Sequence, residues 1–155
     1  MPAGAVEPFV SIQAEDFDAA DVAARLTAGR SNIGAVVTFT GLCRDEDGAL
    51  AALELEHYPQ MAEKQIRAIA GQAIARWPLD GLAVIHRHGK IAPGGNIVLV
   101  VAASAHREAA FKAAEFLMDY LKTRAPFWKR EHLADGSQGE WVAAKDADDE
   151  AAGRW

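Results

Sequence analysis

The segment from Ile97 to Ala103 is apolar at every position, and this run constrains the fold more than any other feature of the sequence. A strand with one buried and one solvated face is apolar only at every second position. A continuous apolar run therefore predicts a strand that is covered on both faces in the centre of a sheet. The turn residues Pro93, Gly94 and Gly95 precede it, so Leu82–Ile91 is expected to pair with it as a hairpin.

Amphipathic segments predict the helices. Pro59 suits a first helical turn, and apolar residues then recur at spacings of three and four as far as Trp77. A second apolar stripe runs along the segment Ala105–Thr123 and predicts another helix. Pro126 prevents this helix from continuing. Asp18–Ala28 is a shorter candidate.

Other segments have the composition of strands. Gly34–Gly41 and Ala51–Tyr58 flank a polar loop and are expected to form a hairpin with a long, charged tip. Phe127–Leu133 and Glu140–Ala144 predict a final strand pair, and Phe9–Ile12 a short first strand. Hairpins mixed with helices predict an α+β fold, with a mixed or antiparallel sheet and about three helices, rather than a doubly wound parallel sheet.

The 155 residues, half of them apolar, are enough for one core but too few for two independent domains. We expect a flexible tail at residues 1–8 and a single domain at residues 9–155. The net charge of -6 argues against a surface built to hold nucleic acid. One cysteine, and no signal-like or membrane-spanning stretch, favour a cytoplasmic protein away from membranes.

An unusual group of residues stands where the helix Ala105–Thr123 is expected to begin. Ser104 is a plausible N-cap, which places His106 and Arg107 in the first turn. The partial positive charge of a helix N-terminus disfavours arginine there, and a bound phosphate or carboxylate would resolve the conflict. The alternative is that Arg107 pairs with Glu108 or another surface acid.

Four cations lie between Lys122 and Arg130 in this acidic chain. Lys122 ends a helix and Lys129 opens a strand, so both amines could approach the same volume. Crowding by other cations and shielding by Phe127 and Trp128 would lower the lysine pKa values and suit acid/base or nucleophilic chemistry. Alternatively Lys122 and Arg124 only complement the dipole at the C-terminal end of the helix, or the cluster is an anion-binding or single-stranded RNA-binding module.

Three further features carry weaker signals. Arg44 follows a strand in a loop, where ligand contacts are common, although a lone loop arginine is more often solvated. Cys43 could carry sulfur as a thiolate, but such a cysteine is more often a small packed hydrophobe. His86 and His88 have no acidic or cysteine partner at ligand spacing, so we predict no metal site.

Several blocks of the chain, taken together, resemble a known family. They are Gly34–Gly41 with Arg44, Leu55–Tyr58, His86–Gly89, Ser104–Arg107 and above all Met118–Glu131. The matches run in order from about Phe9 to Trp155, and the Met118–Glu131 block is long and specific. The chain resembles the catalytic, large subunit of molybdopterin synthase.

The resemblance implies an α/β hammerhead-type fold and a sulfurtransferase that needs neither cofactor nor metal. It also implies a homodimer within a heterotetramer, with a small ubiquitin-like sulfur-carrier subunit on each protomer. The carrier's C-terminal Gly-Gly tail, as a thiocarboxylate, would donate sulfur to cyclic pyranopterin monophosphate. Two transfers would form the molybdopterin dithiolene in molybdenum cofactor biosynthesis.

The resemblance further assigns roles to residues of this chain. Lys122 and Lys129 would be catalytic. The residues that would line the substrate and tail pocket are Leu42, Cys43, Arg44, His106, Arg107, Arg130 and Glu131. A cyclic phosphate and a thiocarboxylate are both anions, so the two basic groups of residues could supply their counter-charges.

Overall fold

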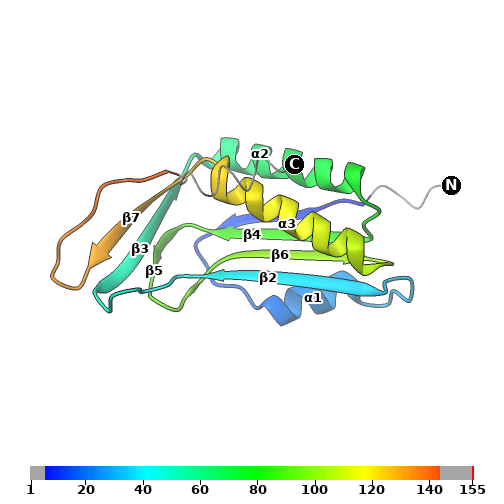
Figure 1. Ribbon diagram of the computed structural model, residues 1–155, viewed down its shortest axis with the longest axis horizontal. Helices are drawn as coiled ribbons and strands as arrows, with labels where there is room; N and C mark the ends of the chain where they lie inside the picture. Colours follow the sequence, from blue (N-terminus) through cyan, green and yellow to red (C-terminus); the bar gives the residue numbers. More distant parts are fainter. Residues whose placement is uncertain (1–5, 144–154) are drawn as a thin grey trace.

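A computed structural model describes residues 6–143 and 155 of the chain. Within these residues it has three helices, α1 (Ala19–Thr27), α2 (Pro59–Arg76) and α3 (Arg107–Thr123), and seven strands (Figure 1). The strands are β1 (Phe9–Gln13), β2 (Ala35–Leu42), β3 (Leu50–His57), β4 (Gly81–Arg87), β5 (Gly89–Ile91), β6 (Asn96–Ser104) and β7 (Phe127–Leu133). The predicted α+β class is confirmed, while most of the predicted tail at residues 1–8 lies outside the described residues.

A four-stranded sheet in the order β1-β4-β6-β2 forms the body of the molecule. β1 pairs with β4 in parallel, and the other pairs are antiparallel, so the sheet is mixed. β6 lies inside this sheet and is buried from Val98 to Ser104, which confirms the strand covered on both faces. The predicted pairing of β4 with β6 is also observed.

Helices cover both faces of this sheet (Figure 1). Val84, Val98 and Val100 face the main core beneath α2 and α3, whereas Leu99 and Val101 face α1 on the other side. The alternation of strand side chains thus distributes one apolar run between two cores. Among the described residues, no helix is long and apolar enough to span a bilayer.

Leu117→Ala should lower the free energy of unfolding by about 2–5 kcal/mol. Leu117 lies on α3 with none of its surface exposed, in the core between helix and sheet, so truncation leaves a cavity. Denaturant unfolding followed by circular dichroism measures the change. Lys112→Ala on the exposed side of α3 is the matched control and should change the free energy by less than about 0.5 kcal/mol. Equal midpoints for the two variants would contradict this core assignment.

A three-stranded antiparallel sheet in the order β5-β3-β7 stands at one end of the body (Figure 1). The predicted hairpin of Gly34–Gly41 with Ala51–Tyr58 is therefore wrong. β2 pairs instead with β6, and β3 pairs with β5 and β7. The reason is that β6 offers β2 a long apolar partner, whereas β3 covers the small separate core of Cys43, Leu55 and Ile91.

The predicted strand Leu82–Ile91 is two strands in different sheets. The chain changes direction at Gly89, whose φ of +88° is a backbone conformation that favours glycine. The predicted strand Glu140–Ala144 is reduced to isolated bridges from Lys129 to Val142 and from His132 to Gln138, and Ala144 lies outside the described residues.

Candidate active site

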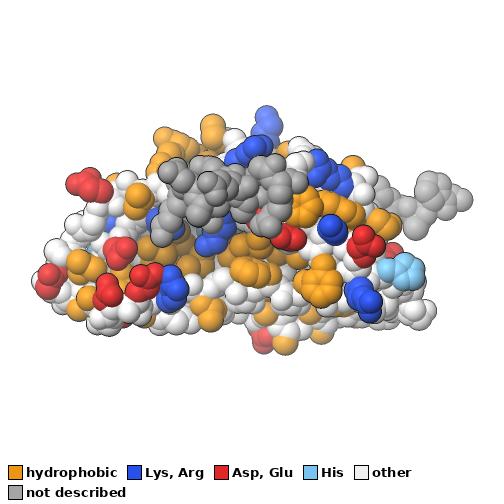
Figure 2. All heavy atoms as spheres, in the orientation of Figure 1, with side chains coloured by type: hydrophobic (Ala, Val, Ile, Leu, Met, Phe, Trp, Pro, Cys, Tyr) orange, Lys and Arg blue, Asp and Glu red, His pale blue; other side chains and the backbone are white. Residues whose placement is uncertain are grey.

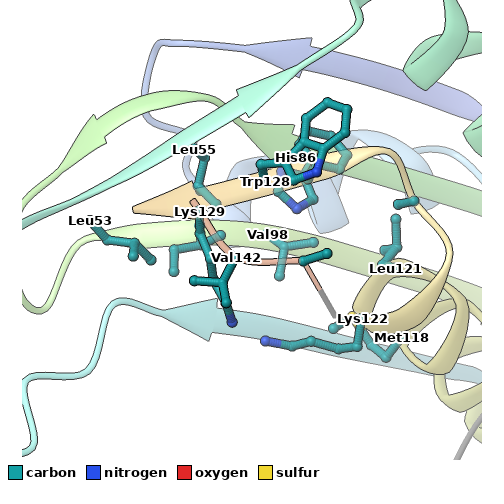
Figure 3. A pocket seen from close by; sticks show the side chains of 14 residues that line it. Leu53, Leu55, His86, Val98, Met118, Leu121, Lys122, Trp128, Lys129 and Val142 are labelled. Carbon is teal, nitrogen blue, oxygen red and sulfur yellow. The ribbon is translucent and has the colours of Figure 1, made fainter. Parts of the chain in front are cut away.

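A narrow pocket of about 90 Å³ lies where the end of α3 meets the three-stranded sheet (Figure 3). Its apolar wall is formed by Leu53, Leu55, Val98, Met118 and Leu121. Lys122 and Lys129 also line it, and Figure 3 shows their amines extending toward one another from α3 and β7. Two cations beside an apolar wall make this pocket suited to an anionic ligand with a slender, uncharged body.

Local sequence explains why the two lysines converge. The N–H of Arg124 donates to the carbonyl of Tyr120 at 2.8 Å, and Pro126 then prevents further helix, so Lys122 stands in the last turn of α3. In β7, Lys129 pairs with the buried Leu55 and therefore faces the same side of the sheet. The prediction that the two amines approach one volume is confirmed. The predicted shielding is not observed for Lys122, which is exposed, while Lys129 is half-buried.

Arg130 points to the opposite side of β7 from Lys129, because side chains alternate along a strand. Its guanidinium lies 4.4 Å from the centre of the Trp141 ring, and Nη1 donates to Gln138 at 3.0 Å. Glu131 is on the same side as Lys129 but is exposed and pairs with Leu53 further along the strand. The structure thus does not bring Arg130 to the two lysines.

The segment from Leu42 to Arg44 lies in the connection from β2 to β3, between the two sheets, and none of its three residues lines the pocket. Leu42 is 56% exposed at the end of β2, and Arg44 is exposed and paired with Glu46. Cys43 is buried against Leu55, and burial raises the pKa of its thiol. A buried thiol with a raised pKa is a poor nucleophile, which supports the interpretation of Cys43 as a packing residue.

Cys43→Ser should keep most of the sulfur-transfer activity that the family resemblance implies, although a buried hydroxyl in place of the thiol should lower the melting temperature. Single-turnover transfer at a temperature where the variant is folded measures the first effect, and calorimetry the second. Mass spectrometry of the wild-type chain during turnover is the companion measurement. Loss of activity in the folded variant, or a persulfide on Cys43, would make the cysteine a sulfur carrier.

His106 and Arg107 lie at the other end of α3 from the pocket. Arg107 and Lys122 are separated along the helix by about 22 Å at 1.5 Å per residue. Within residues 6–143 and 155, Arg107 makes no salt bridge, so the predicted pairing with Glu108 is not observed. One chain therefore cannot bring these two residues to its own lysine pocket.

The predicted N-cap of α3 is also wrong. The cap residue is His106, without a side-chain cap bond, and Ser104 is instead a buried residue of β6. The Ser104 hydroxyl donates to the carbonyl of Pro78 at 2.7 Å, so tertiary packing rather than helix capping decides its position. The free amides and the arginine at this helix end keep the properties expected of an anion site.

His86 is a residue of the pocket that sequence reasoning considered only as a metal ligand. It lies at the end of β4 with 6% of its surface exposed and lines the pocket together with both lysines. The signal in the sequence is an imidazole that directly follows the apolar run Leu82–Ile85. Among the described residues, no group of three or more His, Cys, Asp or Glu side chains is placed to hold a metal ion.

Comparisons with known proteins agree with this architecture. The model of the MoaE protein family matches residues 12–124. A molybdopterin synthase catalytic subunit from Mesorhizobium japonicum is 70% identical over 148 residues, which are 96% of this chain and 93% of the relative. Another from Brucella melitensis is 65% identical and covers 94% of this chain and 90% of the relative.

The fold is likewise shared with solved structures. The molybdopterin biosynthesis MoaE protein from Burkholderia ambifaria superposes with a TM-score of 0.82 at 46% identity, over 96% of this chain and 97% of that one. Fold and sequence together define the class, which is that of the catalytic subunits of molybdopterin synthases, enzymes that transfer sulfur. Within that class, the chain belongs to the MoaE protein family.

Proposed function

We propose that the pocket between α3 and β7 is where sulfur passes from a carrier thiocarboxylate to cyclic pyranopterin monophosphate. The observation that carries this proposal is the convergence of Lys122 and Lys129, from two different elements, on one narrow pocket with an apolar wall. Both reactants are anions and require cations at their binding sites. Amines near a reacting centre also supply the proton transfers that the chemistry needs.

The sulfur donor in this proposal is a small ubiquitin-like subunit whose C-terminal Gly-Gly tail enters the pocket. A cavity of about 90 Å³ has room for a slender chain without side chains, which is what two glycines provide. Among solved structures of the same fold is a protein–protein complex of subunits 1 and 2 of the molybdopterin-converting factor from Helicobacter pylori, with a TM-score of 0.69 and 22% identity.

The proposed reaction makes one carbon–sulfur bond in each transfer. The thiocarboxylate sulfur attacks a side-chain carbon of the pterin, and the carbon–oxygen bond at that carbon breaks, so that the oxygen leaves on the opened phosphate ester or, after protonation, as water. The carrier is then joined to the substrate as a thioester. Water then cleaves the thioester, so the sulfur stays on the pterin and the carrier leaves as a carboxylate. Lys122 and Lys129 would donate and accept protons in these steps and stabilise the negative charge that develops on oxygen.

We propose that the enzyme is a homodimer within a heterotetramer, so that the partner protomer supplies His106 and Arg107 to this pocket. The length of α3 keeps these residues away from the pocket of the same protomer. In a dimer, the same two residues of one protomer can reach the pocket of the other. Within residues 6–143 and 155, β2 is an edge strand, and Val36, Phe39 and Leu42 on it are 42%, 40% and 56% exposed. Exposed apolar side chains on an edge strand support an interface. The cytoplasmic location stays a prediction.

RNA binding is the weaker alternative for the basic segment Lys122–Arg130. Phe127 stacks on His86 with 3.8 Å between ring centres, so its ring is already occupied within the protein. Trp128 packs edge-on against Tyr58 with 5.0 Å between centres. Figure 2 shows basic and acidic side chains interspersed on the face seen there, without one continuous basic patch. These arrangements do not favour base stacking along a charged groove.

The experiment that tests the function combines the purified chain with thiocarboxylated carrier and the cyclic pterin substrate. We expect dithiolene product to form and the carrier to return as its carboxylate form, both of which mass spectrometry measures. A carrier with an ordinary carboxylate is the negative control. Absence of product with verified reactants would refute the assignment, and tight RNA binding that weakens steeply with salt would favour the alternative.

A further inference from the structure

His86 is held in a fixed orientation at the pocket. Its ring lies against Phe127, with 3.8 Å between centres and 16° between planes, and His57 stacks on Phe127 as well at 5.8 Å. These rings come from β4, β7 and β3, so His86 stands at the junction of the two sheets. Figure 3 shows it across the pocket from the two lysine amines.

The hydrogen bonding of His86 determines which ring nitrogen carries the proton. Nδ1 lies 2.8 Å from the backbone carbonyl oxygen of Arg87, and a carbonyl oxygen only accepts. Nδ1 must therefore be the donor. In a neutral imidazole the other nitrogen, Nε2, is then an acceptor with an open lone pair, and among the described residues the ring's hydrogen bond is the one to Arg87.

The surroundings of His86 keep the imidazole neutral. Burial lowers its pKa to about 4, and the nearby Lys122, His57 and His88 act in the same direction, against the raising effect of the Arg87 carbonyl. At neutral pH the ring therefore carries no charge. It presents an uncharged acceptor in a pocket whose other polar side-chain groups are donors, namely the two lysine amines and the indole N–H of Trp128.

A glycine tail has no side chains, so it brings only its backbone N–H and C=O groups and its terminal thiocarboxylate into the pocket. The lysines can satisfy carbonyl and thiocarboxylate oxygens, but the leucine and valine side chains of the wall accept no hydrogen bond, and the thioether of Met118 is only a weak acceptor. A buried backbone N–H without an acceptor destabilises the complex. A neutral Nε2 at this place supplies an acceptor without adding charge.

We propose that His86 is a further binding residue, whose Nε2 accepts a hydrogen bond from a backbone N–H of the carrier's C-terminal glycine tail. The inference rests on the proposed function, since it concerns the same pocket. In this site the lysines would bind the carbonyl oxygens and the thiocarboxylate of the tail, and His86 would bind a backbone N–H of the tail.

Two variants separate the two nitrogens of the ring. His86→Asn keeps an amide N–H near the position of Nδ1 but has no atom near Nε2, whereas His86→Gln places an amide group near Nε2 that is able to accept. We expect His86→Asn to raise the KM for carrier about 10-fold, the effect of one lost neutral hydrogen bond, with little change in kcat. His86→Gln should recover most of this loss. Equal KM values for Asn and Gln would indicate a packing role.

Nitrogen NMR on the wild-type chain tests the inference without any substitution. With ¹⁵N-histidine, the spectrum of the free protein should show the neutral, Nδ1-protonated ring. Addition of the carrier in its carboxylate form should shift the Nε2 resonance toward the value of a hydrogen-bonded nitrogen. If the carrier binds by calorimetry and Nε2 does not move, the proposal for His86 is wrong while the proposed function stands. If no binding occurs, the proposed function itself fails.

Discussion

Lys122→Ala should lower the single-turnover rate of sulfur transfer by about 10²- to 10⁴-fold, with a much smaller change in carrier affinity. A lost general acid or base has an effect of this size, whereas an exposed ion pair contributes only about 1 kcal/mol or less to binding. Lys122 is exposed and lines the pocket from the last turn of α3, so its truncation leaves the core intact. Rapid-quench kinetics with saturating carrier measures the rate.

Lys122→Arg is the more informative variant, because it keeps the positive charge but replaces the amine with a guanidinium, which does not give up its proton in proteins. We expect this variant to be nearly as slow as Lys122→Ala. Lys112→Arg, on the exposed side of the same helix, is the matched control and should react at the wild-type rate. A near-normal rate for Lys122→Arg would mean that Lys122 is an electrostatic anchor, and its assignment as acid or base would be wrong.

A carrier shortened by its terminal glycine, with the thiocarboxylate on the preceding residue, should lose more than about 10²-fold in turnover. One residue of extended chain spans about 3.3–3.6 Å, so the sulfur would be withdrawn by that distance. Reacting atoms must come within about 3–3.5 Å, and a displacement of about 1 Å already lowers rates by as much as 10²-fold. The narrow pocket gives the carrier body no room to follow the tail inward.

Single-turnover assays that compare the full-length and shortened thiocarboxylates measure this effect. Calorimetry with the same two carriers is the control, since the shortened carrier should still bind through its folded body. Normal turnover with the shortened carrier would refute insertion of the tail and would place the sulfur donor elsewhere on the partner.

The sequence predicted those parts of the structure that local physical chemistry determines. The uninterrupted apolar run of β6 could only be a covered strand, and Pro126 required α3 to end just after Lys122. The end of α3 and the start of β7 four residues later explain why the convergence of Lys122 and Lys129 was predictable. Alternation along β7 also determines that Arg130 faces away from Lys129, so a shared pocket for these two neighbours conflicts with the strand pattern itself.

Long-range pairing was not predictable in the same way. The expected hairpin of β2 with β3 assumed that neighbours in sequence are neighbours in space, but the two strands belong to different sheets. For the same reason His86 was not recognised, because its burial depends on Phe127, which is 41 residues further along the chain. The separation of Arg107 from the lysines likewise became measurable only once α3 was known to run unbroken between them.

The length of the connection between α3 and β7 is itself a determinant of the enzyme's chemistry. Side chains on β7 alternate in direction, and the Phe127 ring is fixed between His86 and His57. Insertion or deletion of a single residue in this turn would reverse the alternation relative to the pocket and present the neighbour of Lys129 in its place. Such a change would remove no apolar or basic residue of the site from the sequence. It would nevertheless replace the Lys129 amine at the pocket with the indole of Trp128 or the guanidinium of Arg130. This turn should therefore tolerate amino-acid substitutions better than insertions or deletions.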